Sequence, residues 1–355
     1  MSGRAKVPLP EVSRAAVGPV CVVTGAGGYL GRWLVEALVD LGCTVRALDR
    51  ALADVPGAEW VRCDIRDETA LGEAFEGADV AFHLAAVIEL RGLATRAVRD
   101  HVWGVNVGGT DAVLKACGDE GVRKLVYVSS NNVCVDGERI EQDETAPYAA
   151  RTWDLYTVTK IEAEKRVLAA NRLGLRTCAL RPGGIWGPGD GGYMLRDFLG
   201  RLARGQFVAV IGESSAVGDN THVFNLVRAL LQASAALERP EMGGRAWFVT
   251  DDERINPIEW FQPVVAHLGL PWPSRRVPGR VAWAVAALAE WFHRLGGPMP
   301  ALTRGGVLKV ASSTSFRIDA ARRDLGYEPI VKRDDGLAAA MSDLERVYRE
   351  FQEGR

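Results

Sequence analysis

The chain has 355 residues, enough for one large core or for two domains of ordinary size. Hydrophobic residues make up 48% of the chain and charged residues 25%, which is ordinary for a globular protein that folds in water. The formal net charge of -2 gives no sign of the basic surface that a nucleic-acid partner needs. Its 6 cysteines are scattered with no Cys-x-x-Cys pair, so the sequence predicts buried thiols, a reducing cytoplasmic compartment and no metal centre.

Segments typical of strands and segments typical of helices alternate along the first half of the chain. The expected strands lie near 20–24, 43–48, 58–63, 78–84, 123–129 and 176–181. The expected helices lie near 29–41, 67–76, 97–119 and 154–173. This alternation predicts an α/β fold, a doubly wound parallel sheet of the Rossmann type with helices on both faces.

The pattern changes after a Pro/Gly-rich segment at 181–192, which predicts a loop. Helical patterns dominate beyond it. We therefore predict three parts: a flexible extension at 1–17, a dinucleotide-binding domain at 18–190, and a smaller, mostly helical substrate lobe at 191–355. Part of that lobe is expected to return and complete the first domain.

One apolar segment of the lobe, VAWAVAALAEWF at 281–292, is too short to span a bilayer. The prediction is a buried helix or a lid over an apolar pocket. A helix that lies on a membrane surface is the alternative.

A glycine-rich turn follows the first expected strand, in VCVVTGAGGYLG at 20–31. Gly25 allows a tight turn, Gly28 lets the backbone approach a pyrophosphate, and Gly31 lets the next helix pack close to the strand. The N-terminus of that helix, at Tyr29 and Leu30, offers free N–H groups and a positive dipole end to phosphates. The context predicts a dinucleotide-binding loop.

Asp49 ends the second expected strand, where a carboxylate would accept hydrogen bonds from the adenosine ribose. A carboxylate there also repels a 2′-phosphate and so favours NAD over NADP. Arg46 and Arg50 flank Asp49, and their positive charges weaken this inference because they could bind a 2′-phosphate.

Tyr156 and Lys160 lie four residues apart in DLYTVTKIEAE, a stretch that predicts a helix, so their side chains share one face. A phenol is a poor base at neutral pH because its pKa is about 10. An ammonium group one turn away favours the phenolate and makes proton exchange feasible. The pair therefore predicts an acid–base centre.

Six motifs in this order resemble those of an extended short-chain dehydrogenase/reductase. They are TGAGGYLG (24–31), HLAA (83–86), NVGGT (106–110), VSS (128–130), YTVTK (156–160) and LRPGGIWGPGD (180–190). HLAAVIEL, VTDDERINPIEWF and ARRDLGYEP make the finer resemblance to the 3β-hydroxysteroid dehydrogenase/isomerase group, especially its bacterial members. The resemblance covers roughly residues 18–349.

The resemblance implies roles for individual residues. Tyr156 would accept the proton of the substrate hydroxyl, Lys160 would hold the nicotinamide ribose, and Ser130 would hydrogen-bond the reacting oxygen, with Ser129 the alternative. The other cofactor contacts it implies are Asp64 and Ile65 at the adenine, Leu84, Ala85 and Ala86 along the cleft, Asn106 beneath it, and Pro182, Gly183 and Ile185 at the nicotinamide.

The implied activity is NAD-dependent oxidation of a steroid 3β-hydroxyl to the ketone, with double-bond isomerisation left open. Aromatic residues of the lobe suit an apolar substrate; these are Trp186, Trp260, Phe261, Trp272, Trp283, Trp291 and Phe292. The family also implies a homodimer through helices 97–119 and 154–173. Peripheral contact with a membrane is left open.

Three alternatives to this activity stay open. The first is a sterol-4-carboxylate 3-dehydrogenase that decarboxylates its substrate. The second is a sugar-nucleotide epimerase or reductase, for which Arg196, Arg201 and Arg204 would supply the diphosphate contacts. The third is a dinucleotide-binding sensor without activity. The sequence also departs from its relatives in HVFNLV, where Phe224 precedes Asn225, and at Ala229 and Leu230 further along.

Overall fold

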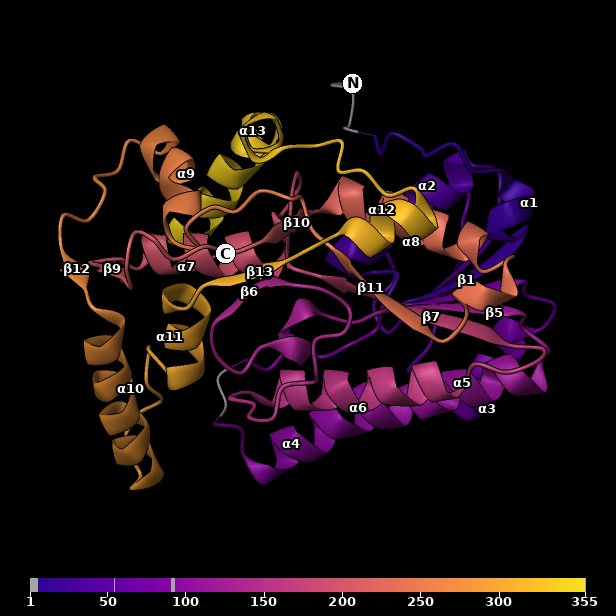
Figure 1. The fold of residues 1–355 in the computed structure, drawn as a ribbon, viewed down its shortest axis with the longest axis horizontal. Helices are drawn as coiled ribbons and strands as arrows, with labels where there is room; N and C mark the ends of the chain where they lie inside the picture. The colour runs from indigo at the N-terminus through magenta and orange to yellow at the C-terminus, as the bar shows by residue number, and fades with distance from the viewer. Residues whose placement is uncertain (1–5, 54, 91–92, 355) are drawn as a thin grey trace.

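The computed structural model describes residues 6–53, 55–90 and 93–354. Within these residues, seven parallel strands form one sheet in the order β11-β7-β5-β4-β1-β2-β3 (Figure 1). The strands are β1 (Val20–Thr24), β2 (Thr44–Asp49), β3 (Glu59–Arg62), β4 (Val80–His83), β5 (Lys124–Val128), β7 (Arg176–Pro182) and β11 (Arg245–Val249). The predicted doubly wound parallel sheet is confirmed. The strand order reverses beside β1, which places the glycine-rich turn at the crevice where such sheets bind ligands.

Helices cover the sheet in two layers (Figure 1). One layer holds α3 (Glu68–Phe75), α5 (Gly109–Asp119) and α6 (Leu155–Ala169), and the other holds α2 (Tyr29–Asp40), α8 (Val223–Ala236) and α12 (Asp319–Leu325). Val22 packs into the first layer and Val23 into the second, as alternation along a strand requires. Because both faces of the central strands β1, β4 and β5 are buried, these strands read as nearly continuous apolar runs.

The single helix expected at 97–119 is interrupted. The chain forms α4 (Arg96–Trp103), then a π-helical turn η1 (Gly104–Gly108), then α5. Such turns are rare and occur often at functional sites. This one carries Asn106.

The chain beyond residue 190 builds a helical lobe and also returns to the sheet, where β11 pairs with β7. The lobe core joins α7 (Gly192–Ala203), η4 (Glu259–Phe261), α9 (Gln262–His267) and α13 (Arg333–Gln352) around buried Trp186 and Trp260. A smaller cluster joins α10 (Gly279–Arg294) to α11 (Arg304–Ala311). The remaining short elements are η2 (Asn131–Cys134), β6 (Arg139–Gln142), β8 (Gly184–Trp186), β9 (Val210–Ile211), β10 (Asn220–His222), η3 (Pro240–Met242), β12 (Arg276–Val277) and β13 (Thr314–Phe316).

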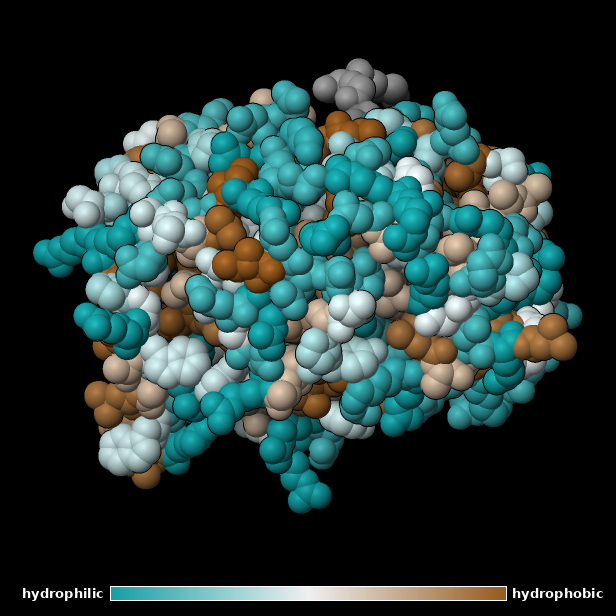
Figure 2. Space-filling model, in the orientation of Figure 1, coloured by the Kyte–Doolittle hydropathy of each residue, from teal (hydrophilic) through white to brown (hydrophobic). Residues whose placement is uncertain are grey.

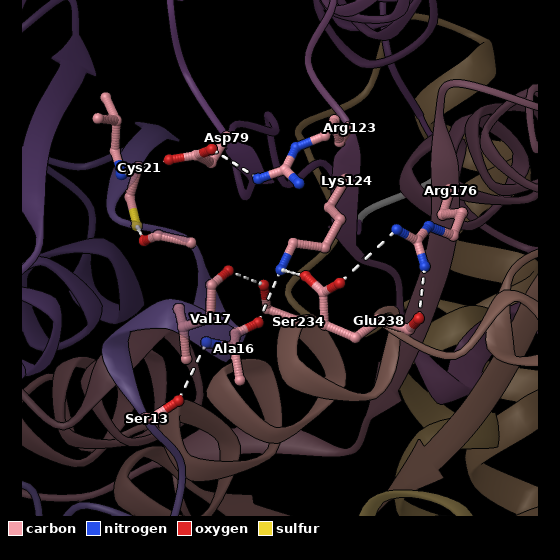
Figure 3. Close-up of polar contacts among 12 residues, drawn as sticks. Ser13, Ala16, Val17, Cys21, Asp79, Arg123, Lys124, Arg176, Ser234 and Glu238 are labelled. Carbon is pink, nitrogen blue, oxygen red and sulfur yellow. Dashed lines mark hydrogen bonds and ion pairs between the residues drawn. The ribbon is translucent and has the colours of Figure 1, made fainter.

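Residues 6–17, the described part of the expected flexible extension, pack against the first domain. They end in α1 (Arg14–Val17), which leads into β1. The buried Lys124 of β5 donates to the Ala16 carbonyl at 2.7 Å and pairs with Glu238 at 2.8 Å (Figure 3). Ser234 of α8 donates to the Val17 carbonyl at 2.6 Å. These contacts tie the segment to β5 and α8; residues 1–5 lie outside the described part.

All six cysteines are buried free thiols, as the sequence predicted. Among the described residues, no helix is both long enough and apolar enough to cross a membrane.

Candidate active site

The glycine-rich turn is built so tightly that Gly25 and Gly31 have no room for a side chain. Gly25 has φ of 72°, and a Cβ on it would lie 2.7 Å from the backbone nitrogen of Ala85. A Cβ on Gly31 would lie 2.2 Å from the Gly25 carbonyl oxygen. Gly28 is the N-cap of α2 and has open space around it apart from that same carbonyl. The turn thus leaves a backbone cradle at the start of α2, as pyrophosphate binding requires.

Asp49 lies at this cradle. Its carboxylate accepts from the backbone N–H of Gly27 at 3.0 Å and of Ala51 at 3.1 Å. Gly27, which the sequence analysis did not single out, has no room for a side chain because a Cβ would lie 2.7 Å from the Ala51 carbonyl. Two N–H bonds leave lone pairs of the carboxylate available to a ribose.

The two arginines that flank Asp49 differ. Arg46 turns away and donates to the carbonyls of Ala74 at 3.0 Å and Glu76 at 2.5 Å, at the end of α3. It is therefore not placed to receive a 2′-phosphate. Arg50, in contrast, is exposed. Its positive charge lies close enough to Asp64 to help lower the pKa of that carboxyl.

The other residues implied for the cofactor line the same edge of the sheet. Leu84 continues β4, its N–H bonding the Thr24 carbonyl at 3.2 Å, and Ala85 and Ala86 follow it past Gly25. Asp64 follows β3, where the Arg66 side chain lowers the pKa of its carboxyl to about 2. Ile65 is buried against Gly109 of α5.

Asn106 joins two parts of the site. Its side chain exchanges hydrogen bonds with the backbone of Val87, at 2.7 and 3.0 Å, and donates to the Thr159 hydroxyl of α6 at 2.8 Å. The amide is buried and satisfied within the protein. It fixes the segment after β4 against the helix that carries Tyr156 and Lys160.

Ser129 and Ser130 follow β5, close to Tyr156 at the start of α6. Ser130 caps η2 by accepting from Asn132 N–H at 3.2 Å, and it also hydrogen-bonds with the side chain of Tyr156. The Ser129 hydroxyl is buried and has no hydrogen-bond partner among the described residues. Of the two serines, the geometry favours Ser130 as the partner of Tyr156.

Lys160 is buried, and none of the carboxylates in the described part of the chain forms an ion pair with its ammonium group. It donates to the Val128 carbonyl at 2.5 Å and lies 4.3 Å from the centre of the Tyr127 ring. Burial lowers the pKa of Lys160 to about 7, although Glu164 acts in the opposite direction.

The pKa of Tyr156 is raised, not lowered as the helical spacing led us to expect. Burial is the main cause, and the charge of Asp154 adds to it, while the hydrogen bond with Ser130 acts against both. The Lys160 nitrogen lies 5.9 Å from the centre of the Tyr156 ring. Desolvation of the phenolate thus decides the direction of the pKa shift of Tyr156.

Asp154, which sequence reasoning missed, begins the helix of the site. It is the N-cap of α6 and accepts from Thr157 N–H at 2.7 Å, while its other oxygen lies 3.3 Å from the Lys309 nitrogen of α11. The spacing Asp-x-x-Thr ahead of an apolar pattern was the available signal. Trp153, next to it, meets Trp283 of α10 edge-on with ring centres 4.9 Å apart.

A buried ion pair, also missed, holds the same helix one turn after Lys160. Glu164 of α6 and Arg181 of β7 approach to 2.6 Å, and the Tyr148 hydroxyl donates to Glu164 at 2.9 Å. Both charged side chains are at most 6% exposed. No spacing in the sequence brings these residues together, because the contact depends on how α6 packs on the sheet.

The residues implied at the nicotinamide lie where β7 ends. A Cβ on Gly183 would lie 2.3 Å from the Asp219 carbonyl, and Ile185 pairs with Thr221 of β10. Pro182 is buried at the end of the strand. The loop that follows meets the glycine-rich turn, since the Tyr29 hydroxyl donates to the Pro188 carbonyl at 3.0 Å. Leu30, beside Tyr29, is a core residue.

The aromatic residues of the lobe divide into two groups. Trp186 and Trp260 are core, Phe261 stacks on Phe198 with ring centres 4.1 Å apart, and Trp272 meets Phe207 edge-on. Trp291 and Phe292 instead point into solvent. The expectation of a buried helix at 281–292 is therefore wrong, because α10 turns only Ala282, Ala286 and Glu290 fully inward.

The departures from the relatives are explained by packing. Phe224 is buried edge-on against Trp33, and Ala229 and Leu230 lie in the core between α8 and the sheet. The Asn225 side chain donates to Asp251 at 2.7 Å and so ties α8 to the segment that follows β11. These positions support the fold and do not enter the site.

Comparisons with known proteins agree with this geometry. A profile of the 3-beta hydroxysteroid dehydrogenase/isomerase family matches residues 22–278. A "3 beta-hydroxysteroid dehydrogenase/Delta 5-->4-isomerase" of Mycobacterium tuberculosis is 40% identical, with 93% of this chain and 92% of that protein covered. Among solved structures, an epimerase of Methanothermobacter thermautotrophicus shares the fold, with 24% identity, a TM-score of 0.75 and 96% of each chain covered. MoeE5 in complex with UDP-glucuronic acid and NAD is 26% identical with a TM-score of 0.72, over 92% of this chain and 99% of that one.

Proposed function

Because the chain belongs to the 3-beta hydroxysteroid dehydrogenase/isomerase family, we propose that it oxidises the 3β-hydroxyl of a steroid to the ketone, with NAD as hydride acceptor. The observation that carries the proposal is the placement of Tyr156, Lys160 and Ser130. They meet at the carboxyl edge of the sheet, on the same side as a glycine cradle that excludes side chains.

The residues of the cradle fit a dinucleotide. Gly25, Gly28 and Gly31 let backbone N–H groups reach a pyrophosphate, and Asp49 keeps lone pairs for the adenosine ribose. Arg46 binds backbone carbonyls at the end of α3 and so is not placed to bind a 2′-phosphate. The carboxylate of Asp49 therefore favours NAD over NADP.

Bound NAD supplies the hydride acceptor and a positively charged ring. In the proposal, Tyr156 takes the proton of the substrate hydroxyl, and Ser130 hydrogen-bonds the same oxygen. Oxidation therefore transfers one hydride and releases one proton. Lys160, whose pKa is lowered by burial to about 7, lies on the same face of α6 as Tyr156 and would hold the nicotinamide ribose.

The sugar-nucleotide alternative finds little support in two of the three arginines that the sequence offered for it, Arg196 and Arg201. Arg201 pairs with Asp197 at 2.8 Å and donates to the Ala301 carbonyl at 3.2 Å. Arg196 lies over the ring of Phe351, with 5.2 Å from the guanidinium carbon to the ring centre. Both are thus engaged within the lobe.

The test offers the protein NAD with four substrates and follows the absorbance of NADH. The substrates are a 3β-hydroxysteroid, its 3α epimer, a 4-carboxysterol and a sugar nucleotide. We expect turnover of the 3β-hydroxysteroid and none of the epimer, because hydride and proton leave in fixed directions. Turnover of the sugar nucleotide alone would refute the proposal. Preference for the carboxysterol with release of carbon dioxide would assign the decarboxylating reaction, and NAD binding without any turnover would assign a sensor.

The implied homodimer stays a prediction. Val98 and Trp103 of α4, in the helical region expected at its interface, are exposed apolar residues, which supports a contact there. Sedimentation velocity of the protein and of a Trp103→Glu variant tests it, since a dimer through this face should dissociate in the variant.

A further inference from the structure

Asp154 places a buried negative charge two residues ahead of Tyr156. Its side chain is only 4% exposed, and one of its oxygens caps α6 by accepting from Thr157 N–H at 2.7 Å. Burial raises the pKa of Tyr156, and the charge of Asp154 raises it further. A negative charge close to a phenol disfavours the phenolate, which is the form that can accept a proton. The residue that begins α6 therefore opposes ionisation of the base that the helix carries.

Lys309 of α11 brings a positive charge to this carboxylate. Its nitrogen lies 3.3 Å from the second oxygen of Asp154 and is shielded from solvent, although part of the lysine stem is exposed. In the described part of the chain, the ammonium group makes no hydrogen bond and no other ion pair. Charges that are shielded from water are screened much less by salt than exposed ones. The two charges should therefore largely cancel at a neighbouring group such as Tyr156.

The pair of Asp154 and Lys309 borders a cavity of about 20 Å³ between η2 and α11. Asn132, which also lines this cavity, donates its backbone N–H to the Ser130 side chain at 3.2 Å. The cavity therefore lies beside the serine that hydrogen-bonds with Tyr156. Its volume has room for about one water molecule, so little solvent competes with the ion pair.

Lys309 comes from the far end of the lobe, where α10 and α11 form a small cluster of their own (Figure 1). Apolar side chains gather on the outer surface of this end (Figure 2), so part of the apolar area of the two helices does not hold them to the first domain. On the inner side, Trp283 meets the Trp153 ring edge-on and Arg304 lies over the same ring at 4.9 Å. The lobe thus meets the start of α6 at Trp153 and at the ion pair.

We propose that Lys309 is a positioning residue for the acid–base centre: it neutralises Asp154, so that Tyr156 faces an ion pair and not a bare carboxylate. Lys160 acts on Tyr156 from its own helix, whereas Lys309 acts on it from the substrate lobe. The electrostatic effect does not depend on the reaction. Its kinetic consequence, a base that works at lower pH because Lys309 is present, rests on the proposed function.

Other titratable groups face Tyr156, Asp154 or the residues beside them, and the experiment leaves all of these groups unchanged. They are Tyr127 of β5, His83 of β4, Glu89 in the segment after β4, Lys160 of α6, Arg151 ahead of α6 and Arg304 of α11. Lys160, with a pKa of about 7, itself titrates near neutral pH. The signal must therefore come from the ring at position 156 and not from a pH profile alone.

The experiment places a fluorinated tyrosine, which is more acidic than tyrosine, at position 156 of the full-length protein and follows its ionisation by fluorine NMR. Lys309→Met should raise the pH midpoint of ionisation by about one unit, because the carboxylate loses its counter-charge. Asp154→Asn should lower the midpoint, since asparagine still caps the helix but carries no charge. The double variant should return close to the midpoint of the protein with both charges.

Two further variants separate charge from packing. Lys309→Arg keeps the positive charge and should keep the midpoint. Lys115→Met removes an exposed lysine of α5 that pairs with Asp119, and as the matched control it should leave the midpoint unchanged.

An equal midpoint in Lys309→Met and the control would overturn the proposal. Shifts of the same sign in Lys309→Met and Asp154→Asn would also overturn it, because they would indicate a structural change at the start of α6. If Lys309→Met does not fold, Asp154→Asn decides alone: a lower midpoint supports the proposal and an unchanged or higher one overturns it.

Kinetics then separates this inference from the proposed function. If both hold, the pH at which kcat/KM for the 3β-hydroxysteroid reaches half its maximum should move in the same direction as the midpoint. Shifted midpoints without turnover by any of the unfluorinated proteins would refute the proposed oxidation and keep the role of Lys309. Turnover with unshifted midpoints would keep the oxidation and overturn the role of Lys309.

Discussion

Replacing Lys160 by methionine should stabilise the fold while it removes activity. The buried ammonium has a pKa of about 7, against an ordinary value of 10.5. At about 1.36 kcal/mol for each pH unit, this difference corresponds to a cost of about 5 kcal/mol for keeping the charge in the folded state below pH 7. Methionine keeps the apolar stem but leaves the Val128 carbonyl without its donor, which costs about 1–3 kcal/mol. We therefore expect a net gain of about 3 kcal/mol in the free energy of unfolding near neutral pH.

The gain should depend on pH in a defined direction. Because the folded-state pKa lies below the ordinary one, the unfolded chain binds more protons between about pH 7 and 10.5. This lysine therefore makes the unaltered protein more stable as pH rises through that window, and less stable as pH falls towards 7. The advantage of Lys160→Met should be largest near neutral pH and should disappear near the ordinary lysine pKa.

Urea denaturation of both proteins across this range measures the effect. The control is Lys165→Met on the exposed side of the same helix, where a surface pair with Glu162 is worth at most about 1 kcal/mol. A gain for Lys160→Met that did not change with pH would refute the reasoning. So would a loss of stability near neutral pH, since it would mean that the contacts of the ammonium outweigh its desolvation.

Further outcomes follow from the same geometry. Tyr156→Phe should lower kcat by about 10²–10⁴-fold while NAD still binds, and retention of most activity would mean that the proton goes elsewhere. Asp49→Ala should narrow or reverse the preference for NAD in kcat/KM; equal use of NADP by the unaltered protein would contradict the assignment of Asp49. Gly31→Ala should destabilise by about 1–3 kcal/mol in thermal unfolding, because its Cβ would lie 2.2 Å from the Gly25 carbonyl. Gly72→Ala, whose Cβ would meet only a side-chain oxygen at 3.8 Å, is its control and should be neutral or stabilising.

The sequence predicted the parts of the site that follow from local geometry. Gly25 and Gly31 were identifiable because a tight turn and a close helix leave no room for Cβ atoms. Tyr156 and Lys160 were identifiable because helical spacing puts them on one face. Gly27 escaped notice because its neighbour, Ala51, comes from another strand connection and is close only after the sheet forms.

Contacts between distant segments could not be predicted in this way. Asp154 meets Lys309 only because α11 packs beside the start of α6. The raised pKa of Tyr156 follows from burial, which a helical spacing does not report. The sequence also could not predict which side of α10 packs against the protein, because its alanines and its large apolar residues both recur with the helical period. Only the packing shows that the alanines are the inner side.

The buried pair of Glu164 and Arg181 limits how this sequence can change over time. Loss of one partner alone leaves a buried charge without compensation, at a cost of about 3–5 kcal/mol, which is a large share of the stability of an ordinary domain. Replacement of both by apolar residues of similar volume is often neutral. Lineages that descend from this chain should therefore keep both charges or exchange both within a short interval. Each such exchange must also preserve the rotation of α6 about its axis, since the same helix aims Tyr156 and Lys160.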